Sequence, residues 1–309
     1  MQFLSPHIIL RNKLIRGEKV AGAGEFIGKF CARTAFRGSE LSMQSAAKKA
    51  DVGVFSGNVD IPAITESLVF TDPYYDAEMN NHNALLDPVV ASIRSNVELK
   101  RRVQKMLMKF ASNTETMVHG DLHSGSIMAT DDELYVIDPE FAQYGPMGFD
   151  LGMVTANFLM AYFSQPAHRG NELDEYQGWI LDVIAKTLHT YRTEFTRLWQ
   201  EERTGMLYPQ ALFESQGHDS SKACEQLLAD THTDAMAFCG IEMHRRCLSL
   251  AHNADFEDIE NPVKRAPLEA RNLQMGMQLI LDAESVSDEH ALIAMAKDYN
   301  QRSLSLIHI

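Results

Sequence analysis

Three short polar motifs follow one another in the middle of the chain: HGDLH at 119–123, DPE at 138–140 and GPMGFD at 145–150. Asp121 follows a β-like run, where a carboxylate could act as a base toward a hydroxyl group. Asp138 and Glu140 are two residues apart, so in extended backbone both side chains would leave the same face. Two oxygen ligands on one face suit Mg²⁺, which proteins commonly hold with one or two carboxylates beside substrate phosphates.

A base carboxylate opposite a magnesium-binding pair is the arrangement of kinase-type phosphoryl transfer. Each acid alone could equally be a turn residue or a helix cap, and Asp150 stands at a helix start where an acid would serve as a cap. The acids together with two close histidines and clustered glycines favour an active site. His119 and Asp150 are then expected to brace the loop by hydrogen bonds, and His123 is expected to be structural.

The elements expected around these motifs are mostly helical. Apolar spacing predicts helices at 26–35, 99–110, 179–199, 221–252, 262–284 and 288–300. Two β-like runs, TMVHG and ELYVID, are predicted to pair as one hairpin with the turn-like ATDD between them. Residues 1–24 and 205–220 are expected to be irregular, and 56–96 to form a long ordered loop. The predicted fold class is therefore α+β, mostly α, with one short catalytic β-hairpin.

Composition and charge narrow the class of protein. The chain has 309 residues, 45% of them hydrophobic and 23% charged, which is ordinary for a globular protein. Its formal net charge of −14 argues against a face that binds nucleic acid. Four scattered cysteines form no C-x-x-C pair and indicate reduced thiols. The longest apolar stretch, 151–163, is too short for a membrane span, and the chain start lacks a signal-peptide pattern. These features predict a cytoplasmic protein with no nucleic-acid or membrane partner.

The sequences VHGDLHSGSIM and YVIDPEFAQYGPMGFDLG resemble the kinase-like fold of aminoglycoside phosphotransferases and choline kinases. Ser126 at the usual Asn position, and DPE followed by YGPMGFD, resemble the methylthioribose kinase family more closely. GIEMHRRCLSLAHNADFEDIE at 240–260 and ITESLVFTDPYYD at 64–76 resemble that family too. The likeness runs from about residue 1 to about residue 300.

This resemblance implies ATP-dependent phosphorylation of S-methyl-5-thio-D-ribose at its C1 hydroxyl, giving the 1-phosphate and ADP in methionine salvage. By the same likeness Asp121 is the catalytic base and contacts the sugar, which Arg245 and Arg246 also bind. Mg²⁺ would be held by Asp138 and Glu140. The ATP contacts implied are Met1, Phe3, Asp138, Pro139 and Glu140. A homodimer is implied as well.

The two arginines can also be weighed from the residues alone. The helix that carries Arg245 and Arg246 is apolar nearly all round, which predicts that it is buried. A buried guanidinium needs an anionic partner. That partner could be a bound substrate, or a structural acid such as Glu242, Asp255 or Asp258.

The chain shows neither the glycine-rich phosphate loop nor the strand lysine that kinases of this type use. MQFLS resembles the hinge between the two kinase lobes. We therefore expect residues 1–10 to be a hinge remnant, 11–300 a kinase-like C-terminal lobe, and the N-terminal ATP-binding lobe to be absent. Residues 301–309 are expected to be an artefactual or disordered tail.

Three alternatives to an active methylthioribose kinase remain open at this point. One is a related small-molecule kinase of the aminoglycoside or choline kinase type. Another is an inactive, truncated kinase. The third is a metal-dependent phosphoesterase, which would require a β-sandwich that the few β-like runs do not supply.

Overall fold

The computed structural model describes residues 4–170 and 172–302. Its helices are α1 (Leu10–Arg16), α2 (Ala23–Arg37), α3 (Ser45–Phe55), α4 (Asp60–Phe70), α5 (Asp87–Ser95), α6 (Val97–Ser112), α7 (Phe149–His168), α8 (Leu173–Glu201), α9 (Ser221–Leu248), α10 (Ala254–Glu257), α11 (Pro262–Leu281) and α12 (Glu289–Gln301). Its strands are β1 (Ile8–Ile9), β2 (Thr116–Val118), β3 (Ile127–Ala129), β4 (Leu134–Val136) and β5 (Gln143–Gly145). The predicted fold class, α+β and mostly α, is confirmed.

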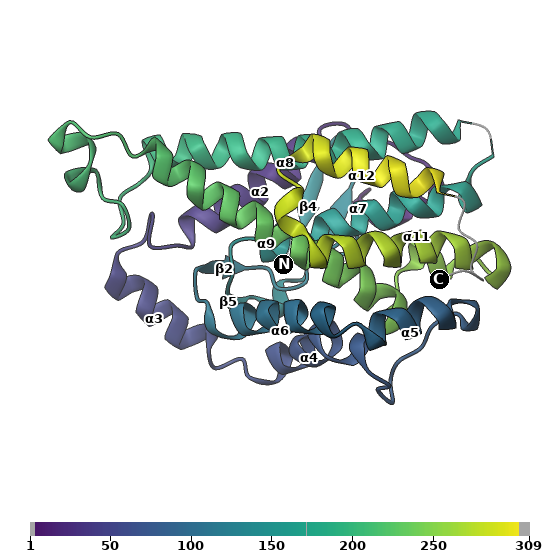
Figure 1. Cartoon of the computed structure of the whole chain (residues 1–309). Coiled ribbons are helices and arrows are strands. Elements are labelled where there is room, and N and C mark those ends of the chain that lie inside the picture. The colour runs from purple at the N-terminus through teal and green to yellow at the C-terminus, as the bar shows by residue number, and fades with distance from the viewer. Residues whose placement is uncertain (1–3, 171, 303–309) are drawn as a thin grey trace.

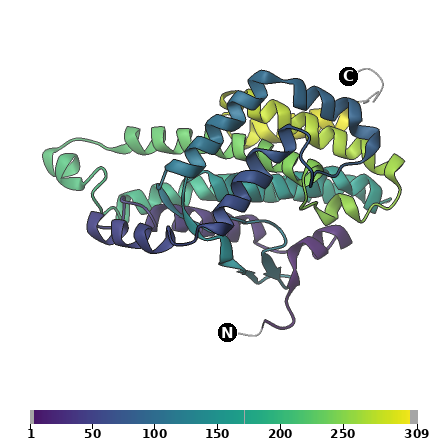
Figure 2. The same cartoon turned by 90° about the horizontal axis from the view of Figure 1, so that it is seen from below.

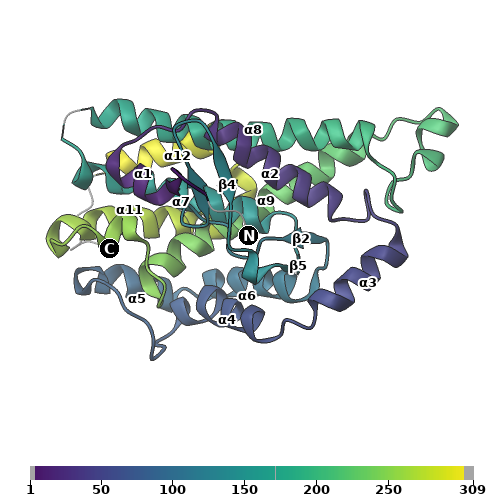
Figure 3. The same ribbon diagram turned by 180° about the vertical axis from the view of Figure 1, so that it is seen from behind.

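The helices form layers around a central group. α7, α9 and α11 pack on one another in the middle of the molecule. α8 and α12 cover one side of this group, and α4, α5 and α6 cover the other (Figure 1). From behind, α1 and α2 lie on the same face as the short strands (Figure 3). The connection between α8 and α9, residues 202–220, protrudes at one end, as the view from below also shows (Figure 2).

The strands form two small sheets rather than the single hairpin that the sequence predicted. β2 pairs antiparallel with β5, while β3 pairs with both β1 and β4. The prediction that TMVHG pairs with ELYVID is therefore wrong. The reason is local: the turn at 130–133 brings β4 back onto β3, which is its nearest partner in sequence. Residues 119–126, between β2 and β3, are left as a loop held between the two sheets.

Two segments expected to be irregular contain helices and a strand. Residues 56–96 hold α4 and α5, and residues 1–24 hold β1 and α1. The starts of α1, α4 and α5 carry no side-chain cap that could have marked them; Asn83, which accepts from Leu85 N–H, caps the 3₁₀ turn at 84–86 that precedes α5. The end of α12 at Gln301 lies inside the predicted tail; residues 303–309 fall outside the described residues. No helix among the described residues has the length and apolarity needed to cross a membrane.

The predicted helices are confirmed, with shifts at some of their ends. α6 buries the stripe that predicted it, and Asn96 caps it by accepting from Leu99 N–H at 3.0 Å. α11 begins with Pro262 at its first position and is capped by Asn261. α9 was expected to continue to residue 252, but it ends at Leu248.

α7 and α9 cross in close contact at Gly152. A Cβ on Gly152 would lie 2.4 Å from Ala235 O and 2.8 Å from Phe238 Cβ, both in α9. Contacts under 3.0 Å with backbone atoms cannot be relieved by turning a side chain, so the two helices would have to separate. Glycine at this position sets the distance between the helix that follows the polar motifs and the helix that carries the two arginines.

We predict that Gly152→Ala lowers the free energy of unfolding by about 2 kcal/mol or more, because the added methyl group overpacks this crossing. The matched control is Gly178→Ala in α8, where a Cβ would meet nothing within 4 Å. That change should stabilise the chain by roughly 0.5–1 kcal/mol through helix propensity. Urea denaturation of both variants is the measurement. Equal effects of the two substitutions would contradict the close crossing.

Candidate active site

The polar loop at 119–126 is held in place by a carboxylate at the start of α7. Asp150 Oδ2 accepts from His119 N–H at 2.6 Å, and Asp150 Oδ1 accepts from Gly120 N–H at 3.1 Å. Asp150 is buried, and burial raises its pKa, opposed by His119 and these backbone donors. The expectation that Asp150 braces this loop is confirmed. If the loop moved, the buried carboxylate of Asp150 would lose its two backbone hydrogen-bond donors, which would cost free energy.

His119 ties the same loop to the segment that carries the DPE motif. His119 Nε2 lies 2.8 Å from Ile137 O, while within the loop His119 Nδ1 accepts from Asp121 N–H at 3.3 Å. Gly120 has φ +84°, and a Cβ there would lie 2.1 Å from Phe141 O. Glycine is needed for both the left-handed backbone and the close approach. Residues 137 and 141 thus contact the loop on both sides of 138–140.

The hydroxyl of Ser126 closes the loop internally. Ser126 Oγ accepts from His123 N–H at 2.9 Å and donates within reach of Asp121 O at 3.1 Å. Ser126 is 3% exposed. The side chain is therefore committed to fixing the backbone on which Asp121 stands.

Both arginines of α9 reach Asp121, more than a hundred residues away in sequence. Asp121 Oδ1 accepts from Arg245 Nη1 at 3.3 Å and from Arg246 Nη2 at 3.2 Å. On their other side Glu242, 0% exposed, accepts from Arg246 Nε at 2.5 Å and from Arg245 Nη1 at 3.3 Å. The structural acid that was one predicted partner is Glu242, and the arginines also contact the candidate base. Asp255 pairs with Arg11 instead.

The charges around Asp121 keep it ionised. Burial alone would raise the pKa of Asp121, but the hydrogen bond from His123 and the charges of Arg246 and Arg245 hold that pKa well below its usual range. For Arg246, burial lowers the pKa, but Glu242 and Asp121 outweigh it and raise that pKa. Two carboxylates and two guanidiniums therefore balance one another in a region that excludes most water.

His123 fixes the second oxygen of Asp121. His123 Nε2 lies 3.2 Å from Asp121 Oδ2. Its Nδ1 accepts from Gly125 N–H at 2.9 Å, so the ring proton must be on Nε2, where it can be donated to Asp121. Burial lowers the pKa of His123, and Asp121 opposes that shift. The neutral ring that results orients Asp121, which agrees with the structural role expected for His123.

The backbone at 138–140 differs from the extended conformation that the sequence predicted. Asp138 has φ +64°, in the left-handed region, and Pro139–Phe141 form one turn of 3₁₀ helix. The argument that an i, i+2 spacing in a strand puts Asp138 and Glu140 on one face is therefore wrong. β4 ends at Val136, which lies opposite Ile127, where its partner β3 begins. A left-handed non-glycine residue is strained, and such residues cluster at functional sites.

Asp138 and Glu140 still have the donor chemistry that Mg²⁺ requires. Both are exposed, and neither carboxylate takes part in a hydrogen bond or ion pair within residues 4–170 and 172–302. In the same part of the chain, no group of three or more His, Cys, Asp and Glu side chains is arranged to hold a metal. Two free carboxylates fit an ion that keeps waters and phosphate oxygens as its other ligands.

Of the three remaining predicted ATP contacts, only one lies within the described residues. Met1 and Phe3 lie outside the described residues, and Pro139 is exposed. Sequence reasoning missed Asn58, whose Nδ2 donates to Glu140 O at 3.3 Å, and Arg11, which lies against the loop at 119–126. Neither has a motif around it. Only the folded chain brings these residues to the site.

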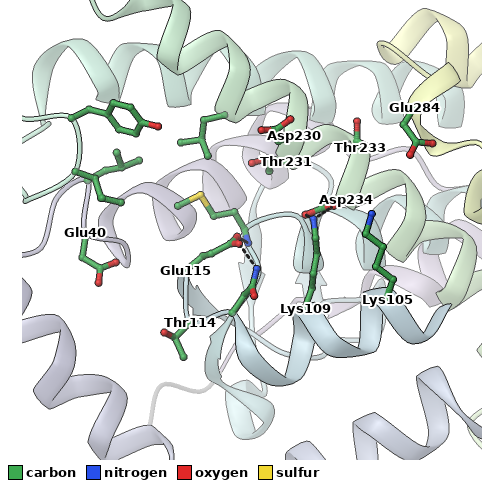
Figure 4. A pocket seen from close by; sticks show the side chains of 16 residues that line it. Glu40, Lys105, Lys109, Thr114, Glu115, Asp230, Thr231, Thr233, Asp234 and Glu284 are labelled. Carbon is green, nitrogen blue, oxygen red and sulfur yellow. Dashed lines mark hydrogen bonds and ion pairs between the residues drawn. The ribbon is translucent and has the colours of Figure 1, made fainter. Parts of the chain in front are cut away.

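The large cavity drawn in Figure 4, of about 840 Å³, lies elsewhere. Its lining comes from α6, α9 and the segments around Glu40 and Tyr208, and includes none of the predicted site residues. Lys109 and Asp234 form an ion pair at 2.6 Å across it. Glu115 at its edge accepts from Met147 N–H.

Comparison of the chain with known proteins shows its family. The phosphotransferase enzyme family (APH) matches residues 55–182, which include the polar loop and the DPE motif. A methylthioribose kinase from Escherichia coli O45:K1 (strain S88) is 38% identical over 300 residues, covering 96% of this chain and 72% of that protein. The chain belongs to the methylthioribose kinase family.

Other members of the methylthioribose kinase family match in the same way. Methylthioribose kinase 1 from Oryza sativa subsp. japonica is 35% identical, and the match covers 89% of this chain and 65% of that protein. The relative from Yersinia pseudotuberculosis (strain IP 31758) is 36% identical, with 94% of this chain and 69% of that protein covered. Among solved structures, a glucosamine kinase aligns with 88% of this chain and 59% of its own, at 14% identity and a TM-score of 0.47.

We predict that Asp121→Asn removes a pH-dependent part of the stability. The folded-state pKa of Asp121 is depressed, so the ionised carboxylate contributes stability that is present above about pH 4 and is lost as the pH falls further. Wild type should therefore be more stable than the variant at pH 7, and the difference should narrow below pH 4. Asp182→Asn, an exposed position on α8, is the control. Urea denaturation at several pH values tests this, and a difference that grows in acid would contradict it.

Proposed function

We propose that this chain carries the base and the sugar site of an ATP-dependent kinase acting on S-methyl-5-thio-D-ribose. The observation that carries the proposal is the meeting of both α9 arginines on one oxygen of Asp121. A carboxylate base with two guanidiniums beside it suits a reaction in which a hydroxyl attacks an anionic phosphoryl group. The names of the relatives supply the substrate class.

In this proposal Asp121 orients the attacking hydroxyl. The C1 oxygen of the sugar bonds to the γ-phosphorus of ATP, the bond to ADP breaks, and the hydroxyl proton goes to Asp121. Because the pKa of Asp121 lies well below its usual range, it is a weak base. Its main contribution is therefore to hold the hydroxyl in line, and it takes the proton late in the transfer.

Arg245 and Arg246 supply the positive charge. Each has a second anchor on the buried Glu242, so neither guanidinium needs to be ordered when the substrate arrives. A positive group that is already positioned stabilises the charge that develops on the transferred phosphoryl group at little reorganisation cost. The same pair would contact the sugar.

Mg²⁺ and ATP meet the chain at 138–140 in this proposal. Asp138 and Glu140 would hold the ion, which neutralises charge on the ATP phosphates when bound. Asn58 steadies this turn through Glu140 O. Pro139, together with Met1 and Phe3, is proposed to contact ATP.

Several wider statements are proposals of the same kind. The reaction would belong to methionine salvage, and residues 11–300 would form the lobe that carries the base and the sugar site. Four buried, unpaired cysteines support a reducing, cytoplasmic location. The homodimer implied by the family resemblance stays a prediction.

We predict that the purified chain binds methylthioribose and that Arg245→Met raises its Kd at least about tenfold, since a buried contact to a charged group is worth about 1.5 kcal/mol or more. Arg192→Met is the matched control, because Arg192 is also paired with a carboxylate, Glu289, but lies on α8. Calorimetric titration without ATP separates this test from turnover. If wild type and Arg245→Met bound the sugar with the same Kd, the proposal that α9 carries the sugar site would be contradicted.

We also predict that Asp121→Asn lowers methylthioribose-dependent ADP release by about 100-fold or more in the presence of magnesium. The control is Asp132→Asn, in the exposed β3–β4 turn, which should keep the wild-type rate. The readout is a coupled ADP assay on the same preparations. A turnover of Asp121→Asn equal to that of wild type would exclude Asp121 as the base.

A further inference from the structure

Arg11, in the first turn of α1, lies against the polar loop at 119–126, which we call the catalytic loop. Its backbone N–H donates to Ser124 O at 3.0 Å, and its Nε donates to Ser124 Oγ at 3.1 Å. Its Nη2 donates to Asn157 Oδ1 of α7 at 3.1 Å. The Arg11 side chain is only 13% exposed. The guanidinium therefore joins α1, the loop and α7 at one point.

The same guanidinium faces the ring nitrogen of His123 that points away from Asp121. Arg11 Nη2 lies 3.4 Å from His123 Nδ1, and Gly125 N–H donates to that nitrogen at 2.9 Å. Two donors therefore converge on Nδ1. A protonated His123 would aim a second N–H at both of them. Protonation of the ring would have to break the Gly125 contact and bring two positive groups together.

A buried acid holds Arg11 in this position. Asp255 of α10 is 0% exposed, and its Oδ2 lies 3.6 Å from Arg11 Nε. Neither carboxylate oxygen of Asp255 has a hydrogen bond within the part of the chain that the structure describes. Burial raises the pKa of Asp255 to about 6, against the opposing charge of Arg11. Arg11 is thus the counter-ion that Asp255 needs, and Asp255 keeps the guanidinium beside the loop.

We propose that Arg11, anchored by Asp255, is a positioning residue for the catalytic base: together with burial and Arg246 it keeps His123 neutral, so that His123 donates one proton to Asp121 and does not form an ion pair with it. This inference rests on the proposed role of Asp121. An imidazolium next to Asp121 would bind the carboxylate more tightly and make it a poorer acceptor for the sugar hydroxyl. The motif at 119–126 therefore depends on a residue that precedes it by more than a hundred positions.

The charges that face His123 fix the sign of the effect. They are Asp121, which favours the protonated ring, and Arg246 and Arg11, which oppose it. Burial lowers the pKa of His123 most, and Arg246 lowers it more than Arg11 does, so removing the charge of Arg11 takes away the smallest of three opposing contributions. The protonation midpoint of His123 should then move to higher pH.

The test compares Arg11→Gln with Arg11→Lys. Glutamine can still hydrogen-bond to Ser124 or Asn157 but carries no charge, while lysine keeps the charge and loses the planar fork. Long-range ¹H–¹⁵N spectra of the histidine rings report the protonation state directly, with His123→Gln used to assign the signal. Arg37→Met, which removes an exposed pairing with Glu202, is the matched control.

We expect Arg11→Gln to raise the protonation midpoint of His123, to shift the acid limb of kcat to higher pH, and to lower kcat by about 10- to 100-fold near pH 6. The KM for ATP should not change. Arg11→Lys should keep the midpoint close to that of wild type. A midpoint that Arg11→Gln leaves unchanged, or that both variants raise equally, would overturn the proposal.

The spectra do not depend on turnover, so the two proposals can fail separately. If the wild-type chain releases no ADP but Arg11→Gln raises the His123 midpoint, the proposed function fails and the effect of Arg11 on His123 stands. If the wild-type chain is active and the protonation midpoint of His123 is the same in wild type and Arg11→Gln, Arg11 has only a structural role. Thermal unfolding of each variant shows which preparations are folded.

Discussion

Two carboxylates and two guanidiniums meet where α9 packs against the catalytic loop, and the arrangement of the site depends on their balance. Asp121 and Glu242 approach the same two arginines from opposite sides. Removing one member would leave an uncompensated charge in a region that excludes water, which is far more costly than an exposed charge. The position of Asp121 is therefore set by a helix that follows it by more than a hundred residues.

The rest of the fold serves this meeting point. Asp150 at the start of α7 holds the loop backbone, and Gly152, two residues later, lets α9 approach α7 closely. α1 closes the opposite side of the loop through Arg11. The short strands β2 and β3 flank the loop, and their inward side chains are buried in the core. Because α7 takes part in both the loop and the α9 contact, the geometry of base and arginines changes together when α7 moves.

The sequence was sufficient for the parts that local patterns control. Apolar spacing predicted α6, α8, α9, α11 and α12. The polar motifs marked Asp121, whereas the arginines were linked to it only through the family resemblance. It was insufficient where pairing is non-local. The strand partners were wrong because three-residue strands carry almost no register information. The prediction of an extended backbone at Asp138 was wrong because the left-handed conformation there is imposed by neighbouring segments. Arg11 was missed because its partners come from α7, α10 and the loop.

A double-mutant cycle between Asp121 and Arg246 measures the central interaction most directly. The free energy of unfolding would be determined at pH 7 for wild type, Asp121→Asn, Arg246→Met and the double variant. If the carboxylate and the guanidinium are paired as described, the two effects should be non-additive, with a coupling of about 0.5–3 kcal/mol. Effects that add to within about 0.3 kcal/mol would show that α9 does not hold the base, and would contradict this account.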